Sequence, residues 1–437
     1  MIQTSYFLSL YLQISTLQNN CLIFVATVAA FISLFPIGQN INVYGQNGNT
    51  ELPQVNDTNL QIQEYASGFK FPTGMNFLGP DDILVIEKNT GKVKEIRNGT
   101  VVGTVLDVNV ANVSERGLLG IAVSDEPKYV FLFYTETENV DGGEVLGNRL
   151  YRYEFDNGKL TNPKLLLDLP TMPGPSHNGG VLKIGPDKES VYLVIGNMNY
   201  VQNLTFITKA QNNKNGPPPD GRGGVLRITF DGGVVDGKGL LGDEEPLNKY
   251  YAYGIRNSFG IGFDALTGNL WETENGRSTD DEINLVLPGF NSGWREVIGF
   301  SNMTPEFNEE NLEDFGGKGT YRDPEFIWRD TIAPTSVLFV HTDKLGSKYK
   351  DNLFVGSVKN GTVFNFPLDD TRTHLVLTGP LSDKKADTNH ETGDVIFGRN
   401  FGVITDLQIG PDGNLYILSN YKHDGTIFKI TAKNNTN

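Results

Sequence analysis

A histidine on a glycine-rich loop is the first residue of this sequence that suggests acid–base chemistry. His177 lies in Gly174-Pro-Ser-His-Asn-Gly-Gly180, directly before an apolar run that begins at Val181. Glycines let the backbone approach a ligand, and an imidazole that titrates near neutral pH can take a proton from a hydroxyl. His177 is therefore a candidate general base, although a histidine that only stabilises a turn would look the same.

Two cationic segments could bind an anionic group. Arg256 and Asn257 lie between glycines, and a guanidinium can hold a carboxylate or quinone oxygen and stabilise negative charge that develops there. A surface ion pair is the alternative. Lys359 lies in Gly356-Ser-Val-Lys-Asn-Gly361, between two predicted strands. On its own this lysine would be interpreted as a surface residue.

An acidic segment follows a glycine turn and could hold a hard cation. Asp280, Asp281 and Glu282 come shortly after Gly276 and Arg277. Carboxylates and turn carbonyls are the oxygen ligands that Ca²⁺ requires. The spacing is not that of an EF-hand loop, and a solvated acidic turn remains the alternative.

These candidates are positioned by a repeated β-unit. Short β-rich runs separated by Gly, Asn, Asp and Pro recur along the chain, in six pairs of strands. The pairs are 81–87 with 90–96, 129–134 with 148–153, 191–195 with 224–228, 269–273 with 282–286, 352–355 with 361–366, and 414–418 with 425–430. Six such units predict an all-β fold, a six-bladed β-propeller, with a decorated β-sandwich as the alternative. The insertion 199–222 is expected to be a surface loop and a candidate lining of the mouth of the central channel.

Composition excludes several classes of function. The formal net charge of −16 argues against a protein that binds nucleic-acid backbones. A single cysteine excludes an intramolecular disulfide framework and a multi-cysteine metal site. Five scattered histidines leave little room for a multi-histidine metal centre.

The N-terminus predicts export. Residues 1–50 contain no charged side chain, and residues 21–37 form an uncharged apolar run. We expect 1–50 to be a signal peptide or an N-terminal membrane anchor with a polar linker, followed by the propeller domain at 58–433. Seven N-x-S/T sequons agree mildly with an extracellular or cell-surface location.

Together the motifs resemble the soluble glucose/sorbosone dehydrogenase family, the PQQ-dependent aldose sugar dehydrogenases. The resemblance covers roughly residues 60–432 and rests on an ordered set of segments. They are Arg116-Gly-Leu-Leu-Gly-Ile-Ala122, His177-Asn-Gly-Gly180, Gly223-Gly-Val-Leu-Arg227, Tyr253-Gly-Ile-Arg-Asn257, Asp280-Asp-Glu-Ile-Asn284, Asn291-Ser-Gly-Trp294, Ala333-Pro-Thr-Ser336, Ser357-Val-Lys359 and Gly410-Pro-Asp-Gly413.

The resemblance implies a six-bladed propeller with pyrroloquinoline quinone (PQQ) and Ca²⁺ across the channel mouth. His177 would take the proton from the anomeric hydroxyl of an aldose while hydride passes to the quinone, which yields a lactone. Arg256 would steady the reacting quinone oxygen. Further cofactor contacts would come from Glu115, Asn257 and Lys359. Calcium would be held by backbone carbonyls of Gly276 and Arg277, with Asp281 and Glu282 beside them.

Several positions depart from the best-known members of the family. Their last blade carries two arginines where this chain has Val403 and Thr405, and loss of two cationic contacts should weaken the binding of a cofactor with three carboxylates. Ser176 stands where an aspartate is expected before the histidine. Arg277 replaces the usual proline, and its charge is a candidate substitute for the missing arginines.

Three functions remain open from the sequence. The first is an exported aldose dehydrogenase that passes electrons to an external acceptor, since the chain has no C-x-x-C-H haem-attachment motif. The second is a non-catalytic cell-surface propeller that binds glycans or a protein partner, which the missing arginines favour. The third is a Ca²⁺-dependent, lactonase-like hydrolase. A propeller fold alone would support any of them.

Overall fold

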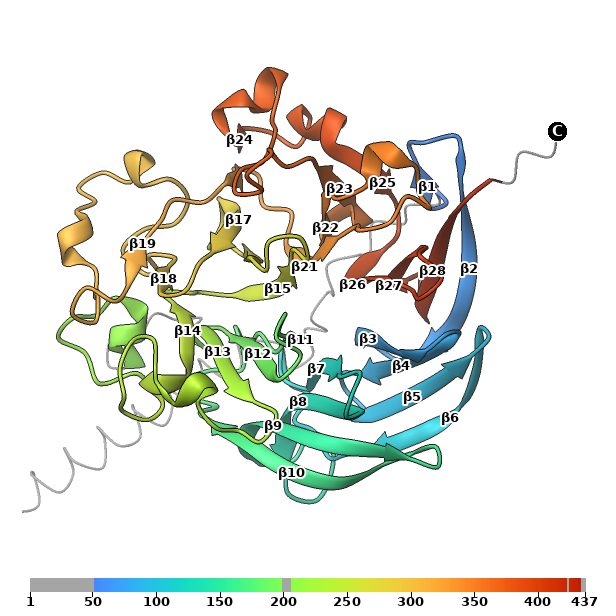
Figure 1. Cartoon of the computed structure of the whole chain (residues 1–437), viewed down its shortest axis with the longest axis horizontal. Coiled ribbons are helices and arrows are strands. Elements are labelled where there is room, and N and C mark those ends of the chain that lie inside the picture. Colours follow the sequence, from blue (N-terminus) through green and yellow to red (C-terminus); the bar gives the residue numbers. More distant parts are fainter. Residues whose placement is uncertain (1–50, 199–205, 423, 434–437) are drawn as a thin grey trace, which may run out of the picture. The chain divides into compact units, whose positions relative to one another are not determined.

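Six β-sheets surround a common centre in the computed structural model (Figure 1). The structure describes residues 51–198, 206–422 and 424–433, which all belong to the compact unit Asn49–Asn437. Within these residues each sheet is one blade, so the predicted six-bladed β-propeller is confirmed. The expected signal or anchor, residues 1–50, lies outside the described residues. No helix in the described ranges is long and apolar enough to cross a membrane.

Each blade is built on four strands that pair in antiparallel fashion. The first three blades are β3 (Pro72–Gly79), β4 (Asp82–Glu87), β5 (Lys92–Arg97) and β6 (Thr100–Asp107); β7 (Leu118–Val123), β8 (Tyr129–Thr137), β9 (Val145–Asp156) and β10 (Lys159–Leu169); and β11 (Leu182–Ile184), β12 (Ser190–Ile195), β13 (Gly224–Thr229) and β14 (Tyr250–Tyr253). The last three are β15 (Ser258–Phe263), β16 (Leu270–Glu274), β17 (Asp281–Val286) and β20 (Phe326–Trp328); β21 (Pro334–Phe339), β22 (Leu353–Ser357), β23 (Val363–Phe366) and β25 (Ile396–Arg399); and β26 (Val403–Ile409), β27 (Leu415–Tyr421), β28 (Asp424–Ala432) and β2 (Leu60–Phe69).

Short additions extend three of the blades. The two-residue strands β18 (Phe290–Asn291), β19 (Thr320–Tyr321) and β24 (Lys385–Ala386) add parallel edges, and β1 (Gln54–Val55) pairs with β25. The helices that the structure describes are short 3₁₀ segments, and none is an α-helix. The six strand pairs expected from the sequence are the second and third strands of the six blades.

The last blade closes the ring. It combines β2, from the beginning of the described chain, with β26 to β28 from its end (Figure 1). Strand β2 pairs with β28 from Leu60, opposite Ala432, to Phe69, opposite Gly425. Sequence-distant segments thus share one sheet, and the ring is held by backbone hydrogen bonds along both strands.

The innermost strands β3, β7, β11, β15, β21 and β26 all contribute to one narrow channel. Glycines allow their close approach: a Cβ at Gly120 would lie 1.9 Å from the carbonyl oxygen of Gly180. We call "the mouth" the end formed by two sets of segments. The first are the loops that precede these strands (108–117, 170–181, 254–257, 329–333), and the second are the described parts of the turns between the second and third strands (88–91, 196–198 with 206–223, 275–280, 358–362).

The described part of the insertion after β12 lies at the mouth, as expected, but it is largely buried and is not the surface loop that its composition suggested. In its described part, 206–223, Gln211, Asn212 and Arg222 are buried. Asn212 donates to Asn291 Oδ1 (2.9 Å) and to the carbonyl oxygen of Trp294 (2.8 Å). Polar side chains that satisfy buried backbone groups explain why so polar a segment packs inward.

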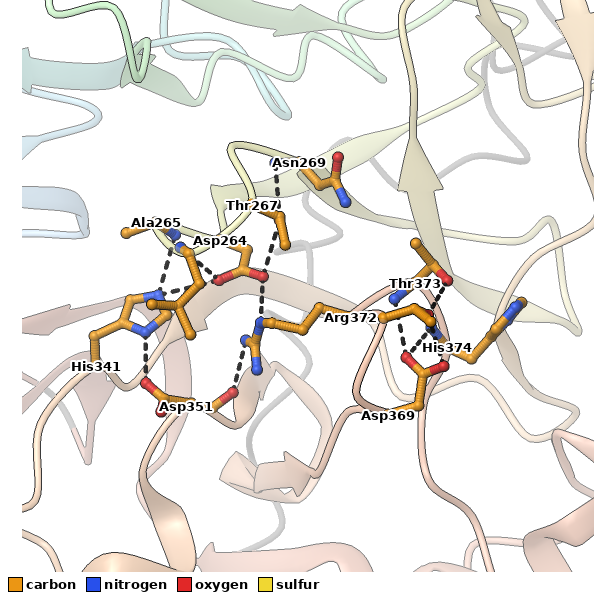
Figure 2. A network of polar contacts seen from close by, with 12 residues as sticks. Asp264, Ala265, Thr267, Asn269, His341, Asp351, Asp369, Arg372, Thr373 and His374 are labelled. Carbon is orange, nitrogen blue, oxygen red and sulfur yellow. Dashed lines mark hydrogen bonds and ion pairs between the residues drawn. The ribbon is translucent and has the colours of Figure 1, made fainter.

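A polar network that includes a second histidine joins the fourth and fifth blades. Figure 2 shows His341 between Asp351, 2.8 Å from Nδ1, and Asp264, 3.3 Å from Nε2. Arg372 donates to the fully buried Asp264 and to the carbonyl oxygen of Asp351. His374, in the same loop as Arg372, pairs with Glu325. These two histidines stabilise contacts between loops, away from the mouth.

Candidate functional site

His177 lies at the mouth, on the loop between β10 and β11. Its φ of +61° is in the left-handed region, and its side chain is only 4% exposed. The backbone N–H of His177 donates to Glu115 Oε2 at 2.5 Å. A Cβ at Gly196 would lie 2.4 Å from the carbonyl oxygen of His177 and 2.7 Å from that of Arg256, so only glycine fits between these two residues.

The ring of His177 is oriented by an asparagine. Nδ1 lies 2.6 Å from Asn197 Oδ1, and since a carbonyl oxygen only accepts, Nδ1 carries the hydrogen and the lone pair is on Nε2. Burial lowers the pKa of His177 to about 4, and the charge of Arg256 acts in the same direction. The neutral imidazole is therefore the form at neutral pH, which is the form that a general base needs.

Glu115 accepts a hydrogen bond from the backbone of the His177 loop and interacts electrostatically with a lysine. Burial raises its pKa to about 7, against the hydrogen bonds from the backbone of His177 and Asn178 and the charges of Arg256 and Lys88. Burial lowers the pKa of Lys88 to about 8, which the Glu115 charge opposes. Lys88 packs against Gly117 and donates to Asn89 Oδ1 at 2.9 Å. Glu115 is thus a positioning residue for the loop.

We expect Glu115→Gln to stabilise the protein at pH 8 and to change its stability little at pH 5. Because the folded pKa exceeds the ordinary 4.5, the folded state binds more protons, and ionisation of Glu115 costs stability as pH rises from about 4.5 to 7. The gain at pH 8 should be about 1–3 kcal/mol, since one pKa unit corresponds to about 1.4 kcal/mol. Thermal melts at both pH values measure it.

The control for this prediction is Glu138→Gln, which changes an exposed glutamate on the loop between β8 and β9. Its melts should follow the wild type at both pH values. A Glu115→Gln variant that is destabilised equally at pH 5 and pH 8 would show that the carboxylate itself, and not its cost of ionisation, dominates.

Arg256 connects the histidine loop to the turn at 275–280. Its guanidinium NH1 donates to the carbonyl oxygens of Asn275 (2.7 Å) and Gly276 (3.1 Å). Its backbone N–H donates to Glu274 Oε1 at 2.5 Å, and its Cζ lies 5.4 Å from the ring centroid of Trp294. Burial lowers the pKa of Arg256, a direction that the acidic neighbours oppose, and the group stays a cation.

Asn257 lies next to Arg256 and is also buried. Its carbonyl oxygen accepts from the backbone N–H of Asn275 at 2.8 Å. Its side-chain Oδ1 has no hydrogen-bond partner among the described residues, and the same holds for Arg256 Nε and Trp294 Nε1. Other buried polar side-chain atoms among the described residues also lack partners, but these three lie together beside the mouth, where a polar ligand could bond to them.

Asp281 connects two of the segments that form the mouth through hydrogen bonds to their backbones. Its Oδ1 accepts from the backbone N–H of Gly276 (2.9 Å), and Oδ2 accepts from those of Ile332 (2.7 Å) and Ala333 (2.8 Å). Burial raises its pKa, and Lys359 is among the groups that oppose this. The carboxylate therefore joins the turn of the fourth blade to the loop that enters the fifth.

Glu282 faces away from the mouth, into a buried acidic cluster. It accepts from Gly299 N–H (2.6 Å) and Asn284 Nδ2 (2.9 Å), and burial, with Glu274 nearby, raises its pKa well above the ordinary value. Burial likewise raises the pKa values of Glu272 and Glu274, next to it on the same sheet. The cluster supports the backbone of Arg256 through Glu274.

Lys359 and Arg277 are exposed at the mouth. The backbone N–H of Lys359 donates to Ile332 O (3.1 Å), and its ammonium contacts Thr331 Oγ1. A series of hydrogen bonds therefore links the loops of the mouth. It runs from Glu115 through His177, Asn197, Arg256, Gly276 and Asp281 to the loop that accepts from the backbone of Lys359. Asn257 and Arg277 are sequence neighbours of Arg256 and Gly276 in this series, whereas Glu282 is outside it, beside Glu274 in the buried acidic cluster.

The mouth is cationic although the chain is acidic. Lys88, Arg116, Arg256, Arg277 and Lys359 all belong to the loops that form it. Strand β26 carries Val403 and Thr405 in place of the expected arginines, and it places Thr405 and its neighbour Asp406 along the channel. Asp406 accepts from the backbone N–H of Met75 at 2.9 Å, and burial raises its pKa, which Lys183 opposes. This carboxylate links the sixth blade to the first.

The donor set fits an anionic quinone better than a calcium ion. The cations and the two unpartnered N–H donors, Arg256 Nε and Trp294 Nε1, suit a ligand with carboxylates and carbonyls, and Asn257 Oδ1 suits an N–H or O–H of that ligand. The expected calcium ligands are otherwise engaged: Asp281 and Glu282 accept backbone or amide N–H groups, and Gly276 O accepts from Arg256. In the described part of the chain, no group of three or more His, Cys, Asp or Glu side chains could hold a metal ion.

Sequence reasoning missed four contributors to the site. Lys88, Asn197, Glu274 and Trp294 carry no motif of their own. Glu274 and Trp294 lie within segments that drew attention for other residues, and Asn197 directly follows a predicted strand and a glycine. The position of a polar residue at the mouth end of a strand is the one signal that could have found Lys88 and Asn197.

Comparisons with known proteins bear on the fold and the family. Residues 69–429 match the model of the glucose/sorbosone dehydrogenase family. The aldose sugar dehydrogenase YliI of Escherichia coli is 24% identical, over 86% of this chain and 94% of its own. Quinoprotein glucose dehydrogenase B of Acinetobacter calcoaceticus is 27% identical, over 80% and 84%. The PQQ-bound aldose sugar dehydrogenase structure from Streptomyces coelicolor has a TM-score of 0.61 at 21% identity, over 87% and 100%, which supports the fold.

Proposed function

Because this chain belongs to the glucose/sorbosone dehydrogenase family, we propose that it oxidises the anomeric carbon of an aldose to a lactone, with PQQ as cofactor. The observation that carries the proposal is the continuous contact series at the mouth. It places a neutral histidine, a buried arginine and an unpartnered asparagine amide oxygen within one connected set of loops.

The roles of the residues follow from their surroundings. His177 takes the proton of the anomeric hydroxyl on Nε2, because Asn197 keeps the hydrogen on Nδ1. Arg256 and Lys359 attract the anionic parts of the cofactor, and Asn257 offers its unpartnered oxygen to a donor. When bound, the quinone would accept the hydride from the anomeric carbon. The proton and the hydride together account for the two hydrogens lost in forming the lactone.

Lys88 and Arg277 are proposed to compensate for the absent arginines of the last blade. Both lie on loops at the same end of the channel, and Lys88 interacts electrostatically with Glu115. Cations from other blades can neutralise carboxylates that Val403 and Thr405 cannot bind.

The test is direct. Titration of the purified protein with PQQ, followed by absorbance, should show saturable binding at micromolar cofactor. Addition of aldoses should then reduce an artificial dye, which stands in for the external electron acceptor. A protein that binds no PQQ at these concentrations would contradict the proposal, whatever its fold.

We also propose that the enzyme works outside the cytoplasm or at the cell surface. The uncharged first 50 residues support this, as a signal peptide or anchor ahead of a catalytic domain at 58–433. Fusion of residues 1–50 to a reporter that is active only after export tests it. A reporter that stays inactive would contradict it.

A further inference from the structure

A cavity of about 150 Å³ lies where the last blade leads into the first. It is lined by the end of β2, by Lys70 in the link to β3, and by residues of β4, β5 and β6 in the first blade (Figure 1). A cavity of this volume can hold a molecule as large as benzene. Three of the lining residues are lysines, Lys70, Lys92 and Lys94. The cavity therefore combines room for a small ligand with a concentration of positive charge.

The strand pattern explains why two of these lysines share the cavity. Residues two apart on a strand point to the same side, and Val93, between Lys92 and Lys94, is fully buried in an apolar cluster shared with the second blade. Lys92 and Lys94 therefore face the last blade, where Phe69 and Ile96 belong to one apolar cluster. A lysine stem packs on apolar surface while its ammonium stays in a polar environment, so the charged ends belong in the open part of the cavity.

The positive charges of the lysines are poorly compensated. Among the three, and within the described ranges, Lys92 is the one with an ion-pair partner, Asp107 at 3.8 Å, and such an exposed pair contributes little. The ammonium of Lys94 donates to Thr104 Oγ1 at 2.9 Å, which is a neutral hydroxyl. Like charges around one cavity repel each other, and an anion between them would offset that repulsion.

The carboxylate that lines the cavity is engaged elsewhere. Glu87 is 2% exposed, its Oε1 accepts from the backbone N–H of Lys70 at 3.0 Å, and its Oε2 accepts from the Thr90 hydroxyl at 2.7 Å. Glu87 thus fixes the link before β3 and the turn after β4. Three ammonium groups and one carboxylate leave the lining with two net positive charges.

We propose that this cavity binds a phosphate group, as the free ion or as an ester, with the ammonium groups of Lys70, Lys92 and Lys94 as donors. A phosphate ester carries about 1.5–2 negative charges at neutral pH, which matches the charge of the lining. Its oxygens point in several directions, and lysine binds phosphate as a point charge, whereas a planar carboxylate matches the arginine fork. The inference is independent of the proposed function, because the cavity shares no residue with the site around His177 and Arg256.

The experiment titrates the full-length protein, without PQQ, with inorganic phosphate in a calorimeter, at an ionic strength kept constant with chloride. Lys94→Met should weaken binding at least about ten-fold, since loss of a charge-assisted hydrogen bond typically has an effect of that size. Lys359→Met is the matched control, because it removes a lysine from the mouth and leaves the cavity unchanged. It should change the affinity for phosphate less than about three-fold.

The comparison of the variants decides the inference. Weaker binding by Lys94→Met alone supports it. Lys94→Met that binds as well as the wild type overturns it, and so does an equal loss in both variants, which would show general attraction to a cationic surface. Glycerol 3-phosphate is the second probe: binding of the ester assigns the phosphate group of a larger molecule, and binding of inorganic phosphate alone assigns the free ion. Absence of binding for both probes at millimolar concentration overturns the inference.

A second measurement needs no variant and covers the case in which Lys94→Met fails to fold, as judged by a thermal melt. The lysines of the wild type are acetylated with an N-hydroxysuccinimide ester, with and without inorganic phosphate, and peptide masses report the modification of each residue. Phosphate should slow acetylation of Lys70, Lys92 and Lys94 several-fold and leave the exposed Lys318 unchanged. Rates at the three lysines that do not respond to phosphate would overturn the inference.

Discussion

His177→Asn is expected to lower kcat for aldose oxidation by about 10²–10⁴-fold, the usual contribution of a positioned general base. The reason is geometric: the ring is held by Asn197 at 2.6 Å, and its neutral form dominates at neutral pH because burial lowers its pKa to about 4. Asparagine is the suitable replacement, because it tolerates the φ of +61° at this position and keeps the backbone contact to Glu115.

Steady-state dye reduction measures the loss, and PQQ absorbance shows that the cofactor still binds. His390→Asn, a change at an exposed histidine before a 3₁₀ helix of the fifth blade, should leave both signals unchanged. If His177→Asn retained kcat within about three-fold, the base would have to be another group, and the assignment at the mouth would be wrong.

Asp281→Ala should lower the free energy of unfolding by about 3 kcal/mol, in the presence of a chelator as well as in its absence. Its carboxylate accepts three backbone N–H groups, and the side chain is 1% exposed. Loss of the acceptor leaves buried donors unsatisfied, each at a cost of about 1–3 kcal/mol, partly offset because the buried carboxylate is no longer present. Denaturant unfolding in EDTA measures the effect.

The neighbouring acid provides the control. Asp280 pairs with Arg329, which is 36% exposed, so Asp280→Asn should cost less than about 1 kcal/mol. If Asp281→Ala were neutral in EDTA and destabilising only with calcium present, Asp281 would be a metal ligand and not a brace for the mouth.

The sequence predicted the second and third strands of every blade because their apolar residues form a clear pattern. Third strands such as β5 alternate buried and partly exposed residues, whereas the second strands are buried on both faces. Such strands appear as continuous apolar runs, as in β4, where Ile83 to Ile86 are fully buried. The first and fourth strands escaped prediction. β3 and β15 contain glycines where strands crowd around the channel, and β6 has exposed residues at its outer edge. Their burial depends on neighbouring blades, which no local pattern records.

The sequence identified those site residues whose side-chain type is unusual in a glycine-rich loop. His177 and Arg256 stood out for that reason, and the structure connects them through Gly196. Partner assignments were beyond the sequence: Asp281 resembles a metal ligand until its three N–H partners are seen, and Arg256 gives no sign that it faces the carbonyl of Gly276. Both partner assignments depend on the distances between residues of different loops, which the sequence does not give.

The pairing of β2 with β28 has a consequence for synthesis. During translation, all other blades are synthesised before residues 424–433. Until β28 is made, the ten residues of β2 have no partner strand and their edge stays exposed. Each premature stop leaves that edge permanently open. We therefore expect truncation before Asp424 to give aggregation in place of a weaker enzyme, because the nine residues of β28 decide whether the ring closes.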